Sequence, residues 1–136
     1  MAKKILVVDD ETNLLQMISQ TLTKAGYSVT TSEDGKDALE KVTQSRPDII
    51  ILDIMMPYLD GFEVLQALRR KQETRNIPVI FLTAKNNDMD IFKGWQAGVN
   101  CYLIKPFNPS ELVKYVKQNL KKGSAVEGAE KRYEIK

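Results

Sequence analysis

Histidine is missing from this sequence of 136 residues, and cysteine occurs only once, at Cys101. Without histidine the chain has no Ser-His-Asp or Cys-His catalytic site, no histidine-ligated zinc and no phosphohistidine of its own. A single cysteine forms neither an internal disulfide nor a multi-thiolate metal site, which fits a reducing cytoplasm. Any chemistry must therefore come from carboxylates, hydroxyls, lysines or a metal ion held by oxygen ligands.

Long apolar runs and a strong net charge are absent as well. No run approaches the roughly 20 residues of a membrane span, and the four apolar residues that follow Lys4 are too few for a signal peptide. The 20 Lys and Arg residues nearly balance the 18 Asp and Glu residues, so nothing favours a nucleic-acid partner. The length fits one domain of ordinary size. We expect a cytoplasmic location, no membrane contact and no direct nucleic-acid binding.

Short apolar runs alternate with helical patterns along most of the chain. Runs rich in β-branched residues predict strands at 5–8, 27–31, 48–53, 77–83 and 100–104. Apolar residues at i, i+3 and i+4 spacing predict helices at 14–25, at 35–46, from 61 onward, at 88–96 and from 109 to about 122. Strands that are apolar throughout belong to a parallel sheet covered on both faces. The sequence therefore predicts a doubly wound α/β domain.

Residues 123–136 have a different character from the rest of the chain. They are rich in Gly, Ala and charged residues and show no strong apolar period. We expect one domain over 1–122, followed by a flexible C-terminal tail over 123–136.

Polar side chains stand where the predicted strands end. Asp9 and Asp10 follow the first strand, and Asp53 closes the third. Thr83 closes the fourth strand, and Lys105 follows the fifth. In open α/β sheets the carboxyl ends of the strands form the ligand-binding edge. Each of these residues alone has an ordinary structural interpretation, but their joint placement predicts that they meet at one site.

Three carboxylates that lie close together repel one another unless a proton or a cation intervenes. Mg²⁺, which prefers oxygen ligands, is the natural counter-ion. Lys105 would add a positive charge and Thr83 a hydroxyl donor. Together these groups form a site for a phosphoryl group, with one aspartate as a possible nucleophile.

Longer motifs surround these residues and carry a family likeness. They are Ile5–Glu11 (ILVVDDE), Pro47–Pro57 (PDIIILDIMMP), Asp60-Gly61, Pro78–Ala84 (PVIFLTA) and Tyr102–Phe107 (YLIKPF). The set resembles the receiver domain of bacterial two-component response regulators, over about residues 3–122. The resemblance implies a flavodoxin-like fold, with a five-stranded parallel sheet in the order 2-1-3-4-5 and five helices.

The resemblance also implies roles for the strand-end residues. Asp53 corresponds to the phospho-acceptor, which takes its phosphoryl group from a sensor histidine kinase or a phosphotransfer protein. Asp10 corresponds to the direct Mg²⁺ ligand and Asp9 to an acid that contacts the ion largely through water. Asp53 and the backbone carbonyl of Met55 complete the implied metal ligands. Lys105 corresponds to the lysine that pairs with phosphoryl oxygens.

A switch is implied by the same family. Thr83 corresponds to the hydroxyl that moves toward the phosphoryl group, and Tyr102 to the aromatic residue that then turns inward. The bond between Lys105 and Pro106 is expected to be cis. A downstream protein partner would read the face made by the fourth helix, the fifth strand and the fifth helix.

Several residues on that face leave the output open. Phe92 and Trp95 on the fourth helix either pack on the sheet or anchor a partner. In the winged-helix transcription factors of the family, an acidic pair precedes the tyrosine and pairs with an arginine of the last helix across a dimer. Asn100 and Cys101 stand in place of that pair, and Tyr115 stands where one such arginine is expected, which weakens the case for that dimer.

Other functions remain open at this point. The chain could be the receiver part of a longer DNA-binding regulator. A Mg²⁺-dependent phosphatase with an aspartyl nucleophile would typically show Asp-x-Asp after the first strand, which Asp9-Asp10-Glu11 does not match. A flavin-binding protein would need a Ser/Thr/Gly-rich phosphate loop there, and a receiver without phosphorylation would not need the full acid set. We therefore expect a signalling phospho-acceptor and no turnover enzyme.

Overall fold

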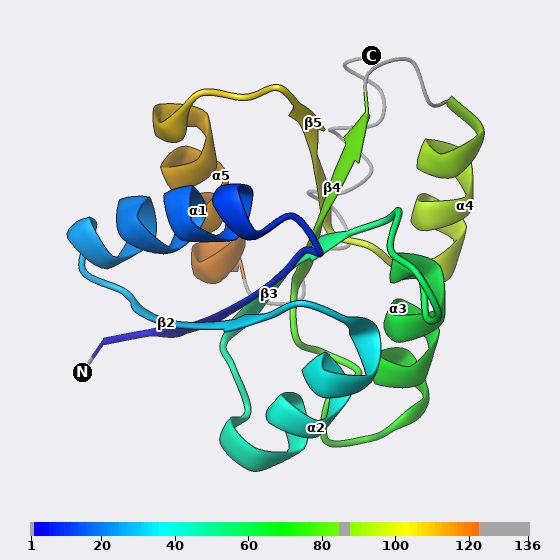
Figure 1. Cartoon of the computed structure of the whole chain (residues 1–136). Helices are drawn as coiled ribbons and strands as arrows, with labels where there is room; N and C mark the ends of the chain where they lie inside the picture. The colour runs from blue at the N-terminus through cyan, green and yellow to red at the C-terminus, as the bar shows by residue number, and fades with distance from the viewer. Residues whose placement is uncertain (1, 85–87, 123–136) are drawn as a thin grey trace.

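Strands and helices alternate along the computed structural model, which describes residues 2–84 and 88–122 (Figure 1). The strands are β1 (Lys4–Val8), β2 (Ser28–Ser32), β3 (Ile49–Asp53), β4 (Val79–Ala84) and β5 (Cys101–Lys105). The helices are α1 (Thr12–Lys24), α2 (Gly35–Ser45), α3 (Gly61–Arg70), α4 (Asp88–Ala97) and α5 (Pro109–Lys122). The tail predicted at 123–136 lies outside the described residues.

All strand pairs are parallel, and the sheet has the order β2-β1-β3-β4-β5. This confirms the predicted α/β class and the order 2-1-3-4-5. Helices α1 and α5 cover one face of the sheet, and α2, α3 and α4 cover the other (Figure 1). None of the helices in the described part of the chain is long and apolar enough to cross a membrane.

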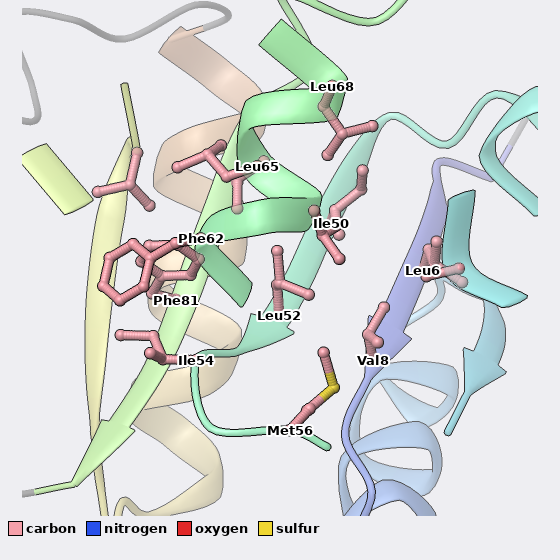
Figure 2. Close-up of a cluster of buried hydrophobic side chains, with 14 of the residues drawn as sticks. Leu6, Val8, Ile50, Leu52, Ile54, Met56, Phe62, Leu65, Leu68 and Phe81 are labelled. Carbon is pink, nitrogen blue, oxygen red and sulfur yellow. The ribbon is translucent and has the colours of Figure 1, made fainter. Parts of the chain in front are cut away.

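Burial on both faces explains why the strands read as continuous apolar runs. Leu6 and Val8 of β1 pack toward α2, α3 and α4, whereas Ile5 and Val7 pack toward α1 and α5. The other strands divide their side chains in the same way, because successive residues of a strand point to opposite faces. Figure 2 shows the cluster on the α3 side, where Phe62, Leu65 and Leu68 lie over the sheet.

Side chains cap the first turns of α3 and α5 by hydrogen bonds to backbone amides. The Asp60 carboxylate accepts the amide of Glu63 at 3.0 Å, and the Glu63 side chain accepts the amide of Asp60 at 2.9 Å. This capping box confirms the predicted start of α3. Asn108 and Glu111 exchange the same pair of bonds before α5, at 2.9 and 3.2 Å.

Two strand boundaries differ from the prediction by enough to matter. β4 begins at Val79 instead of residue 77, because the amide of Ile77 donates to the Thr74 carbonyl at 3.1 Å and Pro78 has no amide hydrogen. Lys105 is the last residue of β5, in register with Ala84, and does not follow the strand as predicted. The backbone of Lys105 is therefore fixed by the sheet and not by a loop.

Candidate functional site

The carboxyl edge of the sheet brings the predicted charged residues together. Asp9 directly follows β1, and Asp53 and Lys105 end β3 and β5. Lys105 Nζ lies 3.2 Å from Asp9 Oδ2 and 3.5 Å from Asp53 Oδ1. Asp9, Asp10 and Asp53 each offer one carboxylate oxygen within 4.8 Å of the others. The structure thus assembles four of the five predicted groups into one charged cluster.

Backbone bonds fix the two buried acids of this cluster. Asp9 is fully buried, and its Oδ1 accepts the amide of Glu11 at 2.9 Å. Asp53 is 5% exposed, and its Oδ1 accepts the amide of Met55 at 3.3 Å. Asp10, by contrast, is exposed. The cluster therefore has a rigid buried side and one acid that faces solvent.

Gly61 supports Asp53 in a way that the sequence motif did not reveal. A side-chain carbon at Gly61 would lie 2.6 Å from the backbone oxygen of Asp53 and 2.8 Å from Ile54 Cα. The amide of Gly61 also donates to the Ile54 carbonyl at 2.9 Å. Only glycine allows α3 to begin this close to the end of β3, so Gly61 is a positioning residue for Asp53.

Charge crowding shifts the titration of the cluster. Burial, together with the neighbouring Asp9 carboxylate, raises the pKa of Asp53 from 3.8 to about 6, although Lys105 opposes the change. Burial alone would lower the pKa of Lys105, but the attraction of Asp53 and Asp9 outweighs it and the pKa rises. One ammonium group faces three carboxylates, so the cluster still has excess negative charge.

This donor set fits a hard divalent cation. Carboxylate oxygens are the ligands that Mg²⁺ prefers, and the shared reach of the three acids allows one ion to contact more than one of them. The pKa of Asp53 stays raised, first by burial and then by the Asp9 carboxylate, although Lys105 opposes the change. Met55 lies two residues beyond Asp53 as expected; its carbonyl as a ligand remains a prediction.

Thr83 and Tyr102 lie on one face of the sheet, on the α4 side. Tyr102 pairs in register with Phe81, and Thr83 pairs with Ile104, so both side chains follow the same pleat. Thr83 is 2% exposed and its Oγ1 reaches the Ala84 carbonyl at 3.4 Å, a long bond. The ring of Tyr102 is turned inward beneath α4.

Figure 1 places α4 beside β4 and β5, and its two aromatic residues lie differently. Trp95 packs against the core, with its ring centroid 5.3 Å from that of Tyr102. Phe92 is 48% exposed. Of the two interpretations that the sequence left open, packing holds for Trp95, while Phe92 is available at the surface.

The residues that replace the acidic pair are interior. Asn100 is 4% exposed and Cys101 is fully buried. Asn100 Oδ1 accepts bonds from the Val79 amide at 2.7 Å and from Arg69 Nη2 at 2.9 Å. Tyr115 packs in the cluster between the sheet and α1 and α5.

Arg69 is a second residue that sequence analysis missed. Its guanidinium donates to the Gly98 carbonyl at 2.9 and 3.1 Å and to the Ile77 carbonyl at 2.8 Å, in addition to Asn100. Burial lowers the pKa of Arg69 to about 10, so the group stays charged at neutral pH. Arg69 therefore ties the end of α3 to the end of α4 and to the start of β5.

A cavity of about 410 Å³ opens beside the charged cluster, between α1 and the segment that joins β5 to α5. Its walls are mainly apolar and include Leu14, Met17 and Phe107. Lys105 and Glu11 stand at the same cavity. The bond from Lys105 to Pro106 is cis, as predicted.

Comparison with known proteins decides the family. The sequence model described as the response regulator receiver domain matches residues 5–117. The chain belongs to the receiver domain family of response regulators. The alkaline phosphatase synthesis transcriptional regulatory protein PhoP of Bacillus subtilis (strain 168) is 43% identical over 122 residues, which is 90% of this chain and 50% of that protein. The receiver thus spans half the length of this curated relative.

Solved receiver structures agree with the fold. The chemotaxis response regulator CheY4 of Vibrio cholerae matches with a TM-score of 0.83 and 38% identity, over 87% of this chain and 98% of that one. The receiver domain of the Francisella response regulator 1452 matches with a TM-score of 0.81 and 37% identity, over 88% and 98%. These matches confirm the predicted family and its flavodoxin-like architecture.

Proposed function

We propose that this receiver accepts a phosphoryl group on Asp53 in a Mg²⁺-dependent reaction and so switches a surface for a downstream protein. The observation that carries the proposal is the charged cluster. Asp9, Asp10 and Asp53 gather within 4.8 Å of one another, and Lys105 stands between the two buried acids. Such a cluster is costly to assemble without a ligand, and a cation with a phosphoryl group would relieve the cost.

The proposed step is a transfer between two nucleophiles. A carboxylate oxygen of Asp53 attacks phosphorus and forms a new O–P bond. The P–N bond to the partner's phosphohistidine breaks, and its electron pair returns to the imidazole. Lys105 would hold the phosphoryl oxygens by charge. Asp9, Asp10, Asp53 and the Met55 carbonyl would hold Mg²⁺. The ion, when bound, supplies positive charge to the same oxygens.

A sensor histidine kinase or a phosphotransfer protein is the proposed donor. The cavity beside Lys105 has apolar walls at Leu14, Met17 and Phe107, which suits apolar side chains of a partner that presents its histidine to Asp53. The free thiol of Cys101 is compatible with a reducing cytoplasm, where we place the protein. The protein would act as a signalling phospho-acceptor that catalyses only its own phosphorylation and dephosphorylation.

The proposed output follows from Thr83 and Tyr102. A phosphoryl group on Asp53 gives the Thr83 hydroxyl a stronger acceptor than the Ala84 carbonyl, which it reaches at only 3.4 Å. Movement of Thr83 would stabilise the inward position that Tyr102 has in this structure and so alter the face made by α4, β5 and α5. A downstream protein would bind that face, where Phe92 is exposed.

Phosphorylation can be tested with a small donor. The receiver is incubated with Mg²⁺ and acetyl phosphate, and the product is read by intact-protein mass spectrometry. We expect one added phosphoryl group, lost in Asp53→Asn and after removal of Mg²⁺ with EDTA. The matched control is Asp48→Asn, which changes a partly exposed acid just before the other end of the same strand.

Asp48→Asn should be labelled like the unmodified chain. Lack of labelling in the unmodified chain, under conditions that label another receiver, would count against the proposal. Continuous release of phosphate from an added phosphomonoester would favour the phosphatase instead.

A second candidate is the receiver part of a longer DNA-binding regulator. The match to half of the transcriptional regulatory protein PhoP favours it. The burial of Asn100 and Cys101 argues against the charged dimer contacts typical of such regulators. Sedimentation of the phosphorylated chain separates the cases: a dimer favours the transcription factor, and a monomer favours a separate protein partner.

A further inference from the structure

α4 contains a glycine that its backbone does not explain. Gly94 lies in the middle of the helix and is buried. Gly26 and Gly98 have the positive φ angles that favour glycine, but Gly94 is not among them. Glycine is the poorest helix former after proline. Some other constraint must therefore favour glycine at this position.

Space beneath the helix supplies that constraint. A Cβ atom at Gly94 would overlap the hydroxyl oxygen of Tyr102 and would lie 2.8 Å from its Cζ. Phe81 Cδ2 would be 3.1 Å away, a contact that a small shift relieves. The hydroxyl of Tyr102 is therefore the atom that occupies the room a side chain at 94 would need.

The inward position of Tyr102 is well supported by its other contacts. Its hydroxyl donates to the Ile91 carbonyl at 2.7 Å. A carbonyl oxygen has two lone pairs, so it can accept this bond as well as a backbone hydrogen bond of the helix. Its ring lies 5.7 Å from that of Phe81 and 5.3 Å from that of Trp95, and the residue is 7% exposed. The hydroxyl of Tyr102 cannot keep this position if a Cβ atom fills the room at Gly94.

We propose that Gly94 forms the socket that admits Tyr102 beneath α4, so that the residue at position 94 sets how readily Tyr102 occupies its inward position. Filling the socket with one methyl group forces the ring of Tyr102 outward and removes it from Trp95. The effect on signalling rests on the proposed function, because there Tyr102 shapes the surface that a partner reads. The socket itself depends only on packing.

The test is a double-mutant cycle of Gly94→Ala and Tyr102→Leu, with urea unfolding as the measurement. In the unmodified background Gly94→Ala should lower the unfolding midpoint, because the methyl group and the hydroxyl compete for one place. In the Tyr102→Leu background the same change should raise the midpoint, since the better helix former remains and the hydroxyl is gone. The Phe81 contact is common to both backgrounds. Gln96→Ala, a change at an exposed position of the same helix, should shift the unfolding midpoint by the same amount in both backgrounds.

Trp95 gives a second readout, because it is the only tryptophan in the sequence. Gly94→Ala should shift its emission to longer wavelength as Tyr102 leaves. Acetyl phosphate and Mg²⁺ should change the emission of the unmodified chain, and Gly94→Ala should lose that change while still being labelled at Asp53. The double variant provides a folded species if Gly94→Ala alone unfolds.

The outcomes separate the two proposals. A Gly94→Ala effect of the same sign in both backgrounds would overturn the socket, whatever the phosphorylation result. An equal phosphorylation-dependent emission change in Gly94→Ala would overturn its role in the switch. Failure of Asp53 labelling in the unmodified chain would overturn the proposed function, but a sign reversal in the cycle would still support the socket.

Discussion

The charged cluster predicts that removing Asp53, the proposed phospho-acceptor, makes the receiver more stable. Burial and the Asp9 carboxylate raise the pKa of Asp53 from its ordinary value of 3.8 to about 6 in the folded chain. Because the folded pKa is the higher one, the folded state holds an extra proton between these values. Stability therefore falls as pH rises through this window, and the loss is complete above about pH 6. Asp53→Asn removes the ionisable group, so this loss of folding stability should disappear.

The size of the effect follows from the shift. Roughly two pKa units at 1.36 kcal/mol each give an upper bound of about 3 kcal/mol. The shift already includes the attraction of Lys105, whose Nζ lies 3.5 Å from Asp53 Oδ1, so no separate correction applies and the expected gain lies below this bound. We expect Asp53→Asn to be about 2 kcal/mol more stable at pH 7.5 without divalent cations, and nearly equal to the unmodified chain near pH 4.

Urea unfolding followed by circular dichroism, in EDTA and across this pH range, measures the difference. Mg²⁺ then gives a second comparison. At ten times its dissociation constant it should stabilise the unmodified chain by about 1.4 kcal/mol. Asp53→Asn lacks one ligand and should gain less, so the difference between the two proteins narrows when Mg²⁺ is added.

Asp48→Asn provides the control, because its amide can still accept the bond that Asp48 Oδ2 takes from the Lys4 amide at 2.7 Å. Its stability should follow the unmodified chain at every pH. The reasoning is wrong if Asp53→Asn proves less stable at pH 7.5 in EDTA. It is also wrong if the gain persists unchanged at pH 4, because the gain would then not come from ionisation.

Two further substitutions test other contacts of the structure. Lys105→Met should destabilise the receiver more at pH 7.5 than at pH 4.5 in urea unfolding, because loss of the ammonium group raises the pKa of Asp53 further. The same substitution should slow labelling by acetyl phosphate about 100-fold. Equal destabilisation at both pH values would contradict the first expectation. Arg69→Met should cost about 1–3 kcal/mol, since it leaves the partly buried carbonyl of Ile77 and the carbonyl of Gly98 without this donor. Arg69→Lys should restore little of the lost stability. Full rescue by lysine in thermal unfolding would show that charge alone matters.

Sequence reasoning succeeds here where local chemistry and one-dimensional pattern agree. The strands are apolar throughout because both faces of the sheet are covered, so their positions stand out in the sequence. Parallel strands end at one edge, which is why Asp9, Asp53 and Lys105 could be placed together although they lie far apart along the chain. The capping pair at Asp60 is equally local.

Prediction stops where a contact depends on which helices become neighbours. Arg69, in the last turn of α3, donates to the carbonyl of Gly98, which follows α4 and lies 29 residues away in sequence. No local sequence pattern predicts such a contact between the ends of two helices. Gly94 reads as a weak point of α4 until the position of Tyr102 is known. Phe92 and Trp95 lie nearly one turn apart, so spacing alone could not tell which of them faces the core.

Under the proposed function, the charged cluster would be the input of a switch and the contacts beneath α4 its output. A ligand shifts a two-state equilibrium only by its difference in affinity for the two states. At the charged cluster, Asp53 and its neighbours would set the difference in affinity for a phosphoryl group. At α4, the fit of Tyr102 beside Gly94 would set the difference in affinity for a protein partner. Thr83 stands on the same strand face as Phe81, whose ring lies against that of Tyr102, and would connect the two under the proposed function. A change at Gly94 should therefore alter the output while labelling of Asp53 continues, which is a separation that substitutions in the charged cluster cannot achieve.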